Sequence, residues 1–487
     1  MNTLPDMSRD SLRGFAHLGM LATLLQSFLS GCAVGPDYRR PEFPVPSHYR
    51  ESLTESLASR SISLATWWQT FRDPPLDRLM AKALRSNRDL RIAETRVREA
   101  RALRNVVSAG FWPTVDASAA YTRLRTSRNG PTGLALARGL LPVETDLYQA
   151  ALDATWELDI FGGTRRAVEA ADAEIGASEE DRRDVLVTLL GEVGLNYIEL
   201  RGLQKEHALT RANLDAQEQT LALTQDRAQA GLATELDVAR AEAQAATTAA
   251  QIPPLESAIK HNVHRLSVLV GESPGSLSGQ WLEAAPIPAT PPEVPVGLPS
   301  ELLRRRPDIR RAERELAAAT ARIGIATADL FPRFSLTGAL GLQSVAASDF
   351  FTGGSRFFSL GPAIHWPIFS AGRIRQNIKV QNLRQEQALL AYEQTVLIAL
   401  EETENALVAY RQAQLRLHQL TEAEKAQQRA VVLAHDRYRS GLVDFLDVLE
   451  AERSLYTSQA HLAQGEWAVS QNLVRLYKAL GGGWTPG

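Results

Sequence analysis

Residues His435 to Glu450 read HDRYRSGLVDFLDVLE, and residues Gln225 to Arg240 read QDRAQAGLATELDVAR. When Gly231 is aligned with Gly441, 210 residues later, the two stretches share Asp, Arg, Leu, Asp and Val at equivalent places. Each glycine stands where a helix end needs a left-handed residue. The Thr or Asp three positions later is a candidate N-cap for a second helix. The sequence therefore predicts two helical hairpins, each closed by a tight glycine turn.

The composition of the chain favours long helices over sheets. Only 7% of its 487 residues are aromatic, and Ala, Leu, Arg, Glu and Gln dominate. The net charge is −3 and no basic block stands out, which gives no support to a nucleic-acid partner. No proline occurs in residues 164–252 or in residues 368–485. A helix of about sixty residues within such a run would be about 90 Å long.

The N-terminus has the pattern of a bacterial lipoprotein signal. Two arginines lie in a polar start, and the apolar core Leu18–Leu29 is too short to be a stable membrane anchor. Small residues then lead to Cys32, the only cysteine. We expect removal of residues 1–31 and attachment of lipid to Cys32, and the following Ala33 favours the outer membrane. The alternative is an ordinary signal peptide with an incidental thiol.

Four later stretches alternate between apolar and polar residues, which indicates strands. They lie at residues 115–122, 148–158, 334–343 and 358–366. Segments of about ten alternating residues with aromatics near their ends are typical of outer-membrane barrels. The first two strands alone fit a soluble, half-buried hairpin equally well. Asp153 and Glu157 fall on the polar face, where we expect them to line a pore.

The whole chain is internally duplicated. LRSNRDLRIAE at Leu84–Glu94 matches LRRRPDIRRAE at Leu303–Glu313, 219 residues later. The predicted organisation follows from this match and from the proline-rich segments. It comprises a signal peptide at 1–31, an extended strap at 32–72, a first structural repeat at 73–271 with a β-hairpin at 112–160, a proline-rich equatorial linker at 272–298, a second repeat at 299–481 with a β-hairpin at 332–368, and a C-terminal tail at 482–487.

Four lipid-facing strands cannot close a barrel alone. An open sheet edge does not survive in hydrocarbon, and the smallest single-chain barrels need eight strands. Sharing one barrel among three chains gives twelve strands. The same symmetry would gather the long helices into a tube in the periplasm. We therefore predict a mainly α fold with β: a homotrimeric β-barrel, four strands per chain, continuous with a long periplasmic α-helical barrel.

The chain resembles the TolC-like outer-membrane efflux family, in its lipoprotein branch. The resemblance covers nearly everything after the signal. It rests on CAVGPDYRRP (32–41), WW with FRDPPL (67–76), LPSELLRRRPDI (298–309), FPRFSLTG (331–338), PIFSAGRIR (367–375) and RYRSGLVDFLDVL (437–449). It implies a homotrimer in the outer membrane that docks to a periplasmic adaptor protein and an inner-membrane pump of the resistance-nodulation-division (RND) class. The cargo would be drugs, solvents or toxic metabolites. The protein would be a passive exit duct without catalysis or a cofactor.

The resemblance also implies a periplasmic gate at the second helix turn. On this sequence the tyrosine, leucine and acidic residue of the gate are Tyr438, Leu446 and Glu450. Three carboxylates converging on an axis repel one another unless paired, and Arg437 and Arg439 are the nearest candidate partners. The alternative is that the tyrosine and leucine are helix-packing residues and the glutamate a solvated charge. The two turns, with Gly231, Leu232, Gly441 and Leu442, are the expected docking tips for the adaptor.

Other functional classes receive little support. His261 and His264 lie three residues apart but have no evident third metal ligand, and no phosphate-binding loop or nucleophile elbow occurs. Two interpretations remain beside drug efflux. One is the outer-membrane duct of a type I protein-secretion system. The other is a lipid-anchored periplasmic coiled-coil scaffold without a pore, which leaves the four amphipathic strands unexplained.

Overall fold

The computed structural model describes residues 33–50, 64–281, 284–291 and 298–485, so the predicted signal peptide and Cys32 lie outside the described residues. The chain forms two compact units. The first, called the sheet unit, contains residues 33–41, Arg98–Gly176 and Glu313–Leu390. The second, called the helical unit, contains the remaining described residues. In the part of the chain that the structure describes, no helix combines the length and the apolar character of a membrane span.

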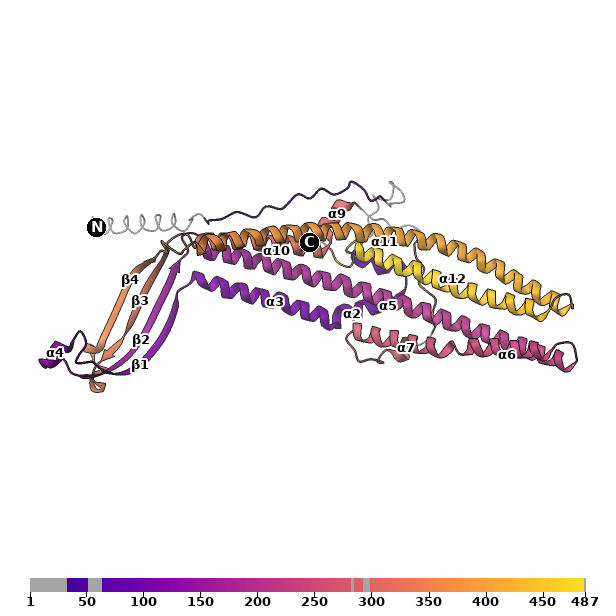
Figure 1. Cartoon of the computed structure of the whole chain (residues 1–487), viewed down its shortest axis with the longest axis horizontal. Helices are drawn as coiled ribbons and strands as arrows, with labels where there is room; N and C mark the ends of the chain where they lie inside the picture. The colour runs from indigo at the N-terminus through magenta and orange to yellow at the C-terminus, as the bar shows by residue number, and fades with distance from the viewer. Residues whose placement is uncertain (1–32, 51–63, 282–283, 292–297, 486–487) are drawn as a thin grey trace, which may run out of the picture. The chain divides into compact units, whose positions relative to one another are not determined.

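The sheet unit holds one antiparallel sheet in the order β1-β2-β3-β4 (Figure 1). Its strands are β1 (Thr114–Arg125), β2 (Glu144–Leu158), β3 (Arg333–Ser344) and β4 (Arg356–His365). These strands confirm the four predicted from alternation. Strands β1 and β4 have only one neighbour each within the described chain, so the sheet has two free edges.

The register of the strands places the apolar side chains on one face. Leu152 lies opposite Ala117 on β1 and Leu340 on β3, and Leu340 lies opposite Phe358 on β4. Within the single chain Leu340 is 61% exposed and Phe358 is 82% exposed. A continuous apolar face of this kind requires cover by lipid or protein. On the opposite face Asp116 lies directly across from Asp153.

The helices follow the duplication. They are α2 (Pro74–Ser86), α3 (Arg88–Ser108), α5 (Gly163–Gln229), α6 (Glu235–Ala249), α7 (Ile252–Leu269), α9 (Pro299–Arg305), α10 (Pro307–Ala328), α11 (Arg373–Arg439) and α12 (Phe445–Ala479), with the short α4 (Gly133–Ala137) and α8 (Ser278–Trp281). Short 3-10 turns also occur, among them η2 (Leu64–Phe71). Helices α5 and α11 have 67 residues each.

Local sequence explains where these helices begin. The Asp73 carboxylate accepts a hydrogen bond from Leu76 N at 3.0 Å and thereby caps the start of α2. Thr234 and Asp237 form a complete capping box at the start of α6. The helix that returns from the first turn is interrupted between α6 and α7, where two prolines occupy the first positions of α7.

The helical unit has one large apolar core. Trp67, Tyr197 and Tyr477 are fully buried in it, and the rings of Trp67 and Tyr477 stack with centroids 5.4 Å apart. The prediction of an extended strap over 32–72 is wrong at its C-terminal end. Residues Leu64–Phe71 form the 3-10 helix η2, because Trp67, Trp68 and Phe71 turn toward the core together.

Two other segments expected to be irregular also have a defined structure. The short helix α8 lies in the predicted linker. In the tail, Gly483 N donates to Leu64 O at 2.7 Å, and Trp484 is buried between the guanidinium groups of Arg183 and Arg310. The segment around 482–485 is therefore part of the core of the helical unit.

Candidate functional site

The two predicted glycine turns have the same geometry. Gly231 has φ +75° and Gly441 has φ +71°, and a side chain at either would meet no atom within 4 Å. Leu232 N donates to Arg227 O at 2.8 Å, and Leu442 N donates to Arg437 O at 2.9 Å. These bonds close helices α5 and α11 as Schellman motifs. The glycines are thus needed for backbone conformation alone, and the exposed leucines after them are free to contact another molecule.

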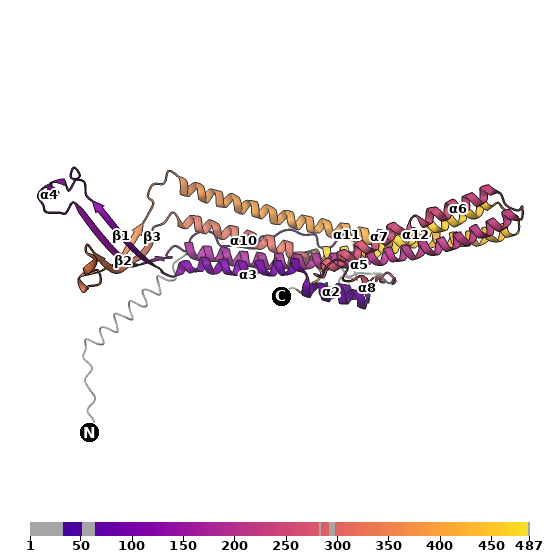
Figure 2. The same ribbon diagram turned by 90° about the horizontal axis from the view of Figure 1, so that it is seen from below.

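A small apolar core lies beside these turns and joins the two helical pairs of the helical unit. It contains Ala241 of α6, Tyr438 of α11, and Phe445 and Val448 of α12. The side chain of Tyr438 is 6% exposed, and its ring centroid lies 5.9 Å from that of Phe445. Figure 2 shows α6 and α12 running toward the same end of this unit. We call this cluster the tip core.

Tyr438 is the centre of the tip core. The guanidinium carbon of Arg227, from α5, lies 4.5 Å from the centre of its ring, so a cation–π contact links α5 to α11. In the described part of the chain its hydroxyl group is buried and has no hydrogen-bond partner. Within a single chain, Tyr438 therefore packs between helices, which is the alternative to a gate role that the sequence left open.

The other predicted gate residues lie on the surface. Leu446 is 43% exposed, and Glu450, one helical turn further along α12, is also exposed. Arg437 and Arg439 are exposed as well. Among the described residues no hydrogen bond or ion pair joins Glu450 to either arginine, so the candidate pairing considered from the sequence does not form within one chain. Leu446 and Glu450 are therefore available to meet another chain.

A ladder of polar contacts connects α5 to α12. No sequence pattern indicates it, because its members are far apart in the chain. Asn213 Nδ2 donates to Gln459 Oε1 at 3.2 Å, and Thr220 Oγ1 donates to Glu452 Oε1 at 3.0 Å. Nearer the middle of the helices, Lys205 pairs with Glu466. We call these contacts the polar ladder. Between the tip core and the large apolar core of the unit, it makes the contact of α5 with α12 hydrophilic over residues 205–220 of α5.

Glu452 is the one carboxylate of the polar ladder that also binds α11. His435 Nε2 lies 2.9 Å from its Oε1 atom, and the Glu452 side chain is only 12% exposed. The carboxylate therefore joins α5, α11 and α12 close to the tip core. Both residues belong to or adjoin the duplicated turn sequence. At the positions 210 residues earlier, the first copy keeps the glutamate as Glu242 but has Gln225 in place of the histidine.

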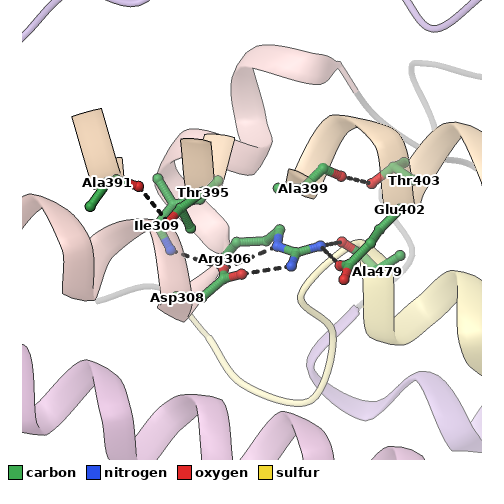
Figure 3. A network of polar contacts seen from close by, with 9 residues as sticks. All are labelled: Arg306, Asp308, Ile309, Ala391, Thr395, Ala399, Glu402, Thr403 and Ala479. Carbon is green, nitrogen blue, oxygen red and sulfur yellow. Dashed lines mark hydrogen bonds and ion pairs between the residues drawn. The ribbon is translucent and has the colours of Figure 1, made fainter. Parts of the chain in front are cut away.

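A second group of polar contacts lies where α10 begins and α12 ends (Figure 3). The Arg306 guanidinium binds the Asp308 carboxylate through two bonds of 3.0 and 2.6 Å, donates to Ala479 O at 3.0 Å, and pairs with Glu402 of α11 at 2.7 Å. Its side chain is only 9% exposed. One arginine thus connects three helices, and we call this arrangement the second joint.

The first repeat contains the equivalent joint with a different residue. Asn87 Nδ2 donates to Leu269 O at 2.9 Å, while its Oδ1 accepts from Leu90 N at 2.9 Å. Asn87 precedes Arg306 by the 219 residues of the duplication, and Leu269 precedes Ala479 by 210. The first joint is therefore a neutral side-chain cap between α7 and α3, and the second joint is ionic and reaches a third helix.

A cavity of about 440 Å³ opens beside the second joint. It is lined by Asp184, Asn405, Asn472, Arg475 and Lys478 together with the joint residues. Burial raises the pKa of the Asp184 carboxyl above its ordinary value, and the nearby charge of Asp308 raises it further. For Arg306, burial acts to lower the pKa, but the bonds to Asp308 and the charge of Glu402 more than offset it, so the guanidinium stays charged.

In the sheet unit a buried arginine holds the strap. Arg166, on α5, donates to Val34 O at 3.1 Å and Gly35 O at 3.2 Å, and it pairs with Asp37 and Glu169 at 2.7 Å each. Its side chain is 5% exposed. The sequence did not single out this residue, because its partners are about 130 residues away. The strap residues nearest to Cys32 are thereby fixed on α5.

Two glycine contacts bring the strap close to the protein surface. A Cβ atom on Gly35 would lie 2.5 Å from Gly324 Cα, and one on Gly162 would lie 2.6 Å from Ala33 Cα. Val34 N also donates to Phe161 O at 3.1 Å. Ala33 therefore lies against the segment that connects β2 to α5. We call Arg166 with these contacts the strap clasp.

Within the described ranges, no group of three or more His, Cys, Asp and Glu side chains is placed to hold a metal ion. His261 and His264 are both exposed on α7. The predicted pore-lining residue Asp153 accepts from Ser118 Oγ at 3.1 Å on the polar face of the sheet. Nothing in these sites is arranged as an acid–base pair or an activated nucleophile.

The model of the family described as outer membrane efflux protein matches residues 79–272 and 298–482. This chain belongs to the outer membrane efflux protein family. The two matched segments together make up more than half of the chain. The efflux channel is 35% identical to the solvent efflux pump outer membrane protein SrpC of Pseudomonas putida over 477 residues, which are 97% of this chain and 99% of the relative.

Two further likenesses agree with this assignment. The channel is 34% identical to the "probable outer membrane lipoprotein SilC" of Salmonella typhimurium, over 94% of this chain and 96% of the relative. Its structure matches that of the outer-membrane channel OprN with a TM-score of 0.85 and 40% identity, covering 93% of this chain and 100% of that one. The protein is thus an efflux channel of the outer membrane that extends into the periplasm, a component of an efflux pump, with the fold class of the trimeric channels.

Proposed function

We propose that this channel is the passive exit duct of a tripartite pump, in which a periplasmic adaptor connects it to an RND pump of the inner membrane. The observation that carries the proposal is the continuous apolar face of a four-stranded sheet with two free edges, in a chain whose other unit is built from paired long helices. Three such sheets close a barrel of twelve strands. The duct has no catalysis of its own.

The proposed cargo is small toxic molecules such as drugs and solvents. Support comes from SrpC, which is named for solvent efflux. The test is the drug and solvent susceptibility of a deletion strain, complemented with the wild-type gene. We expect the deletion to lower the tolerated concentration of several unrelated apolar compounds. Unchanged susceptibility, together with loss of a secreted protein, would instead favour the duct of a type I secretion system.

The proposed gate lies at the tip core. Leu446 and Glu450 are exposed on one face of α12, so threefold symmetry would bring three copies of each together. Tyr438 would act from inside, because its ring holds α11 and α12 against Arg227 of α5. Opening would then require this packing to loosen.

Conductance in planar bilayers tests this assignment. The double variant Tyr438→Ala with Glu450→Ala should raise single-channel conductance, since both the packing and the ring of carboxylates are lost. Tyr438→Phe is the matched control, because it keeps the ring and its contacts and removes only a hydroxyl without a partner. Equal conductance of the double variant and the wild type would contradict the gate.

The proposed docking surface comprises the two turns with Gly231, Leu232, Gly441 and Leu442. Both leucines are 68% exposed, which supports a contact with a partner protein. A β-branched residue at Gly441 would be strained at φ +71° and should abolish efflux while trimers persist. Full efflux by Gly441→Val trimers would show that this turn is not a docking point.

We also propose that Cys32 carries the lipid anchor. The strap clasp supports this, because it fixes Ala33 beside the segment that joins the sheet to α5, where a barrel meets the membrane surface. Lipid on Cys32 would then enter the membrane without stretching the strap. Mass spectrometry of the mature N-terminus tests the proposal, and an unmodified thiol at residue 32 would disprove it.

A further inference from the structure

The charged residues on the apolar face of the sheet are confined to one end. This face is formed by the odd-numbered residues of β1 and the even-numbered residues of the other strands. Its charged residues are Arg123, Arg125, Glu144, Asp146 and Arg356. All five lie at the end where the loops 126–143 and 345–355 connect the strands. We call them the rim cluster.

The rim cluster begins where an apolar band ends. On β2 the apolar band runs from Tyr148 to Leu158, about 33 Å along the strand at 3.3 Å per residue. At a strand tilt of about 40° this is about 25 Å along the barrel axis, the height typical of the apolar band of outer-membrane barrels. Tyr121 and Tyr148 close the band, with ring centroids 5.0 Å apart. Tyrosines at such a boundary lie at the level of lipid headgroups. Arg123 is the next residue of β1 on the same face.

Carboxylates within the cluster orient its arginines but leave much of their surface open. Arg123 lies 2.8 Å from Glu144 and 3.9 Å from Asp146, and Arg125 lies 3.3 Å from Glu144. The Arg123 and Arg125 side chains are still 62% and 76% exposed. Arg356, on β4, is exposed and has no ion pair within the described part of the chain. The guanidinium groups therefore remain largely accessible to a ligand.

The loop beside the cluster adds positive charge and exposed apolar groups. From Arg123 to Asp146 the chain has four arginines and two acidic residues. In this loop, which includes α4 (Figure 1), Leu134 is 66% exposed and Leu140 is 70% exposed. Guanidinium groups suit phosphate, and the tyrosines beside them mark the level of lipid headgroups. Together they indicate a lipid with a phosphorylated headgroup rather than a free anion.

The loop end of the sheet faces the outside of the cell. The opposite ends of the strands continue into α3, α5, α10 and α11, whose other ends lie in the helical unit, and the barrels of this membrane carry their longer loops on the extracellular side. We propose that the rim cluster, together with Arg128 and Arg138, binds the phosphorylated saccharide headgroup of the glycolipid of the outer leaflet. This inference rests on the proposed membrane orientation of the barrel.

The test compares three full-length proteins as trimers in phosphatidylcholine vesicles, with and without purified lipopolysaccharide. They are the wild type, the triple variant Arg123→Gln, Arg125→Gln, Arg356→Gln, and the control Arg333→Gln on the polar face at the other end of the sheet. Loss of three arginines should weaken glycolipid affinity about 100-fold. We therefore expect the glycolipid to raise the dissociation temperature of wild-type and control trimers but not of the triple variant.

Further arms separate the other outcomes. An equal shift with inorganic phosphate, or with phosphatidylglycerol, would overturn the proposal, and so would an equal shift in the triple variant. If the triple variant does not form trimers, Arg356→Gln alone replaces it, because Arg356 has no ion pair to lose within the described part of the chain. Trimers of Arg356→Gln should bind the glycolipid more weakly than the wild type. Unchanged binding would overturn the proposal. Conductance is measured on the same samples. A conducting trimer without a glycolipid effect refutes this inference alone, whereas a wild type that never conducts refutes the proposed function.

Discussion

Replacing Arg306 by alanine should loosen the end of α12 from the rest of the helical unit. The substitution removes a charge-assisted bond to Ala479 O, worth about 1.5–3 kcal/mol, and an ion pair with the half-exposed Glu402, worth about 0–1 kcal/mol. It also leaves Asp308 without its bidentate partner, close to Asp184. Together these losses amount to about 2–4 kcal/mol. At 1.4 kcal/mol per tenfold, opening of the last turn of α12 should become about 30–1,000 times more frequent.

Hydrogen exchange followed by mass spectrometry measures this opening directly. Peptides covering the last turn of α12 should exchange faster in Arg306→Ala, while peptides from the sheet unit should not change. Arg304→Ala is the matched control, since Arg304 is an exposed arginine of the same run. Asn87→Ala should loosen the end of α7 instead. If Arg306→Ala exchanged at the wild-type rate in α12, the joint would not hold the helix and the reasoning would be wrong.

Three further predictions concern Asp184, Arg166 and the α5–α12 contact. Because the pKa of Asp184 is raised by folding, the folded chain binds a proton there more tightly than the unfolded chain does. The free energy of unfolding therefore falls as pH rises through the raised pKa. Asp184→Asn should raise the denaturant midpoint at pH 7, and the difference from the wild type should shrink at acidic pH. Arg166→Ala should release the strap, seen as faster protease cleavage within residues 33–41, whereas Arg104→Ala, an exposed ion-pair partner on α3, should not. Replacing Asn213 and Gln459 together by leucine should lower conductance by making the two helical pairs adhere, and higher conductance would contradict this.

Much of the fold was predictable because its signals are local. Alternation located the four strands, and the glycines at 231 and 441 located the two turns, since each pattern is a direct expression of backbone geometry. The N-cap at Thr234 was predictable for the same reason. Duplication extended each observation to a second place in the chain. The extended strap was predicted to continue to residue 72, but Leu64–Phe71 forms a 3-10 helix. This segment is helical because Trp67, Trp68 and Phe71 are buried together in the core, which no local pattern shows.

The functional contacts were less predictable because they join distant residues. The alignment of the repeats equates Asn87 with Arg306, but nothing in it shows that both side chains reach a helix end more than 170 residues away. The same holds for Arg166 and for Glu452. Tyr438 illustrates a different difficulty. Its position next to the second glycine turn predicts a role at that turn, but only the packing shows that its ring is buried in the tip core.

The polar ladder between α5 and α12 has a consequence for motion. When leucines hold two helices together, sliding one helix past the other exposes apolar surface to water, which costs free energy. When they are held by Asn213, Thr220 and their partners, each broken bond is replaced by one to solvent at nearly the same enthalpy. Over the polar ladder, the surface between α5 and α12 therefore offers little resistance to sliding. Such a contact suits a duct that must open and close repeatedly without an energy source of its own.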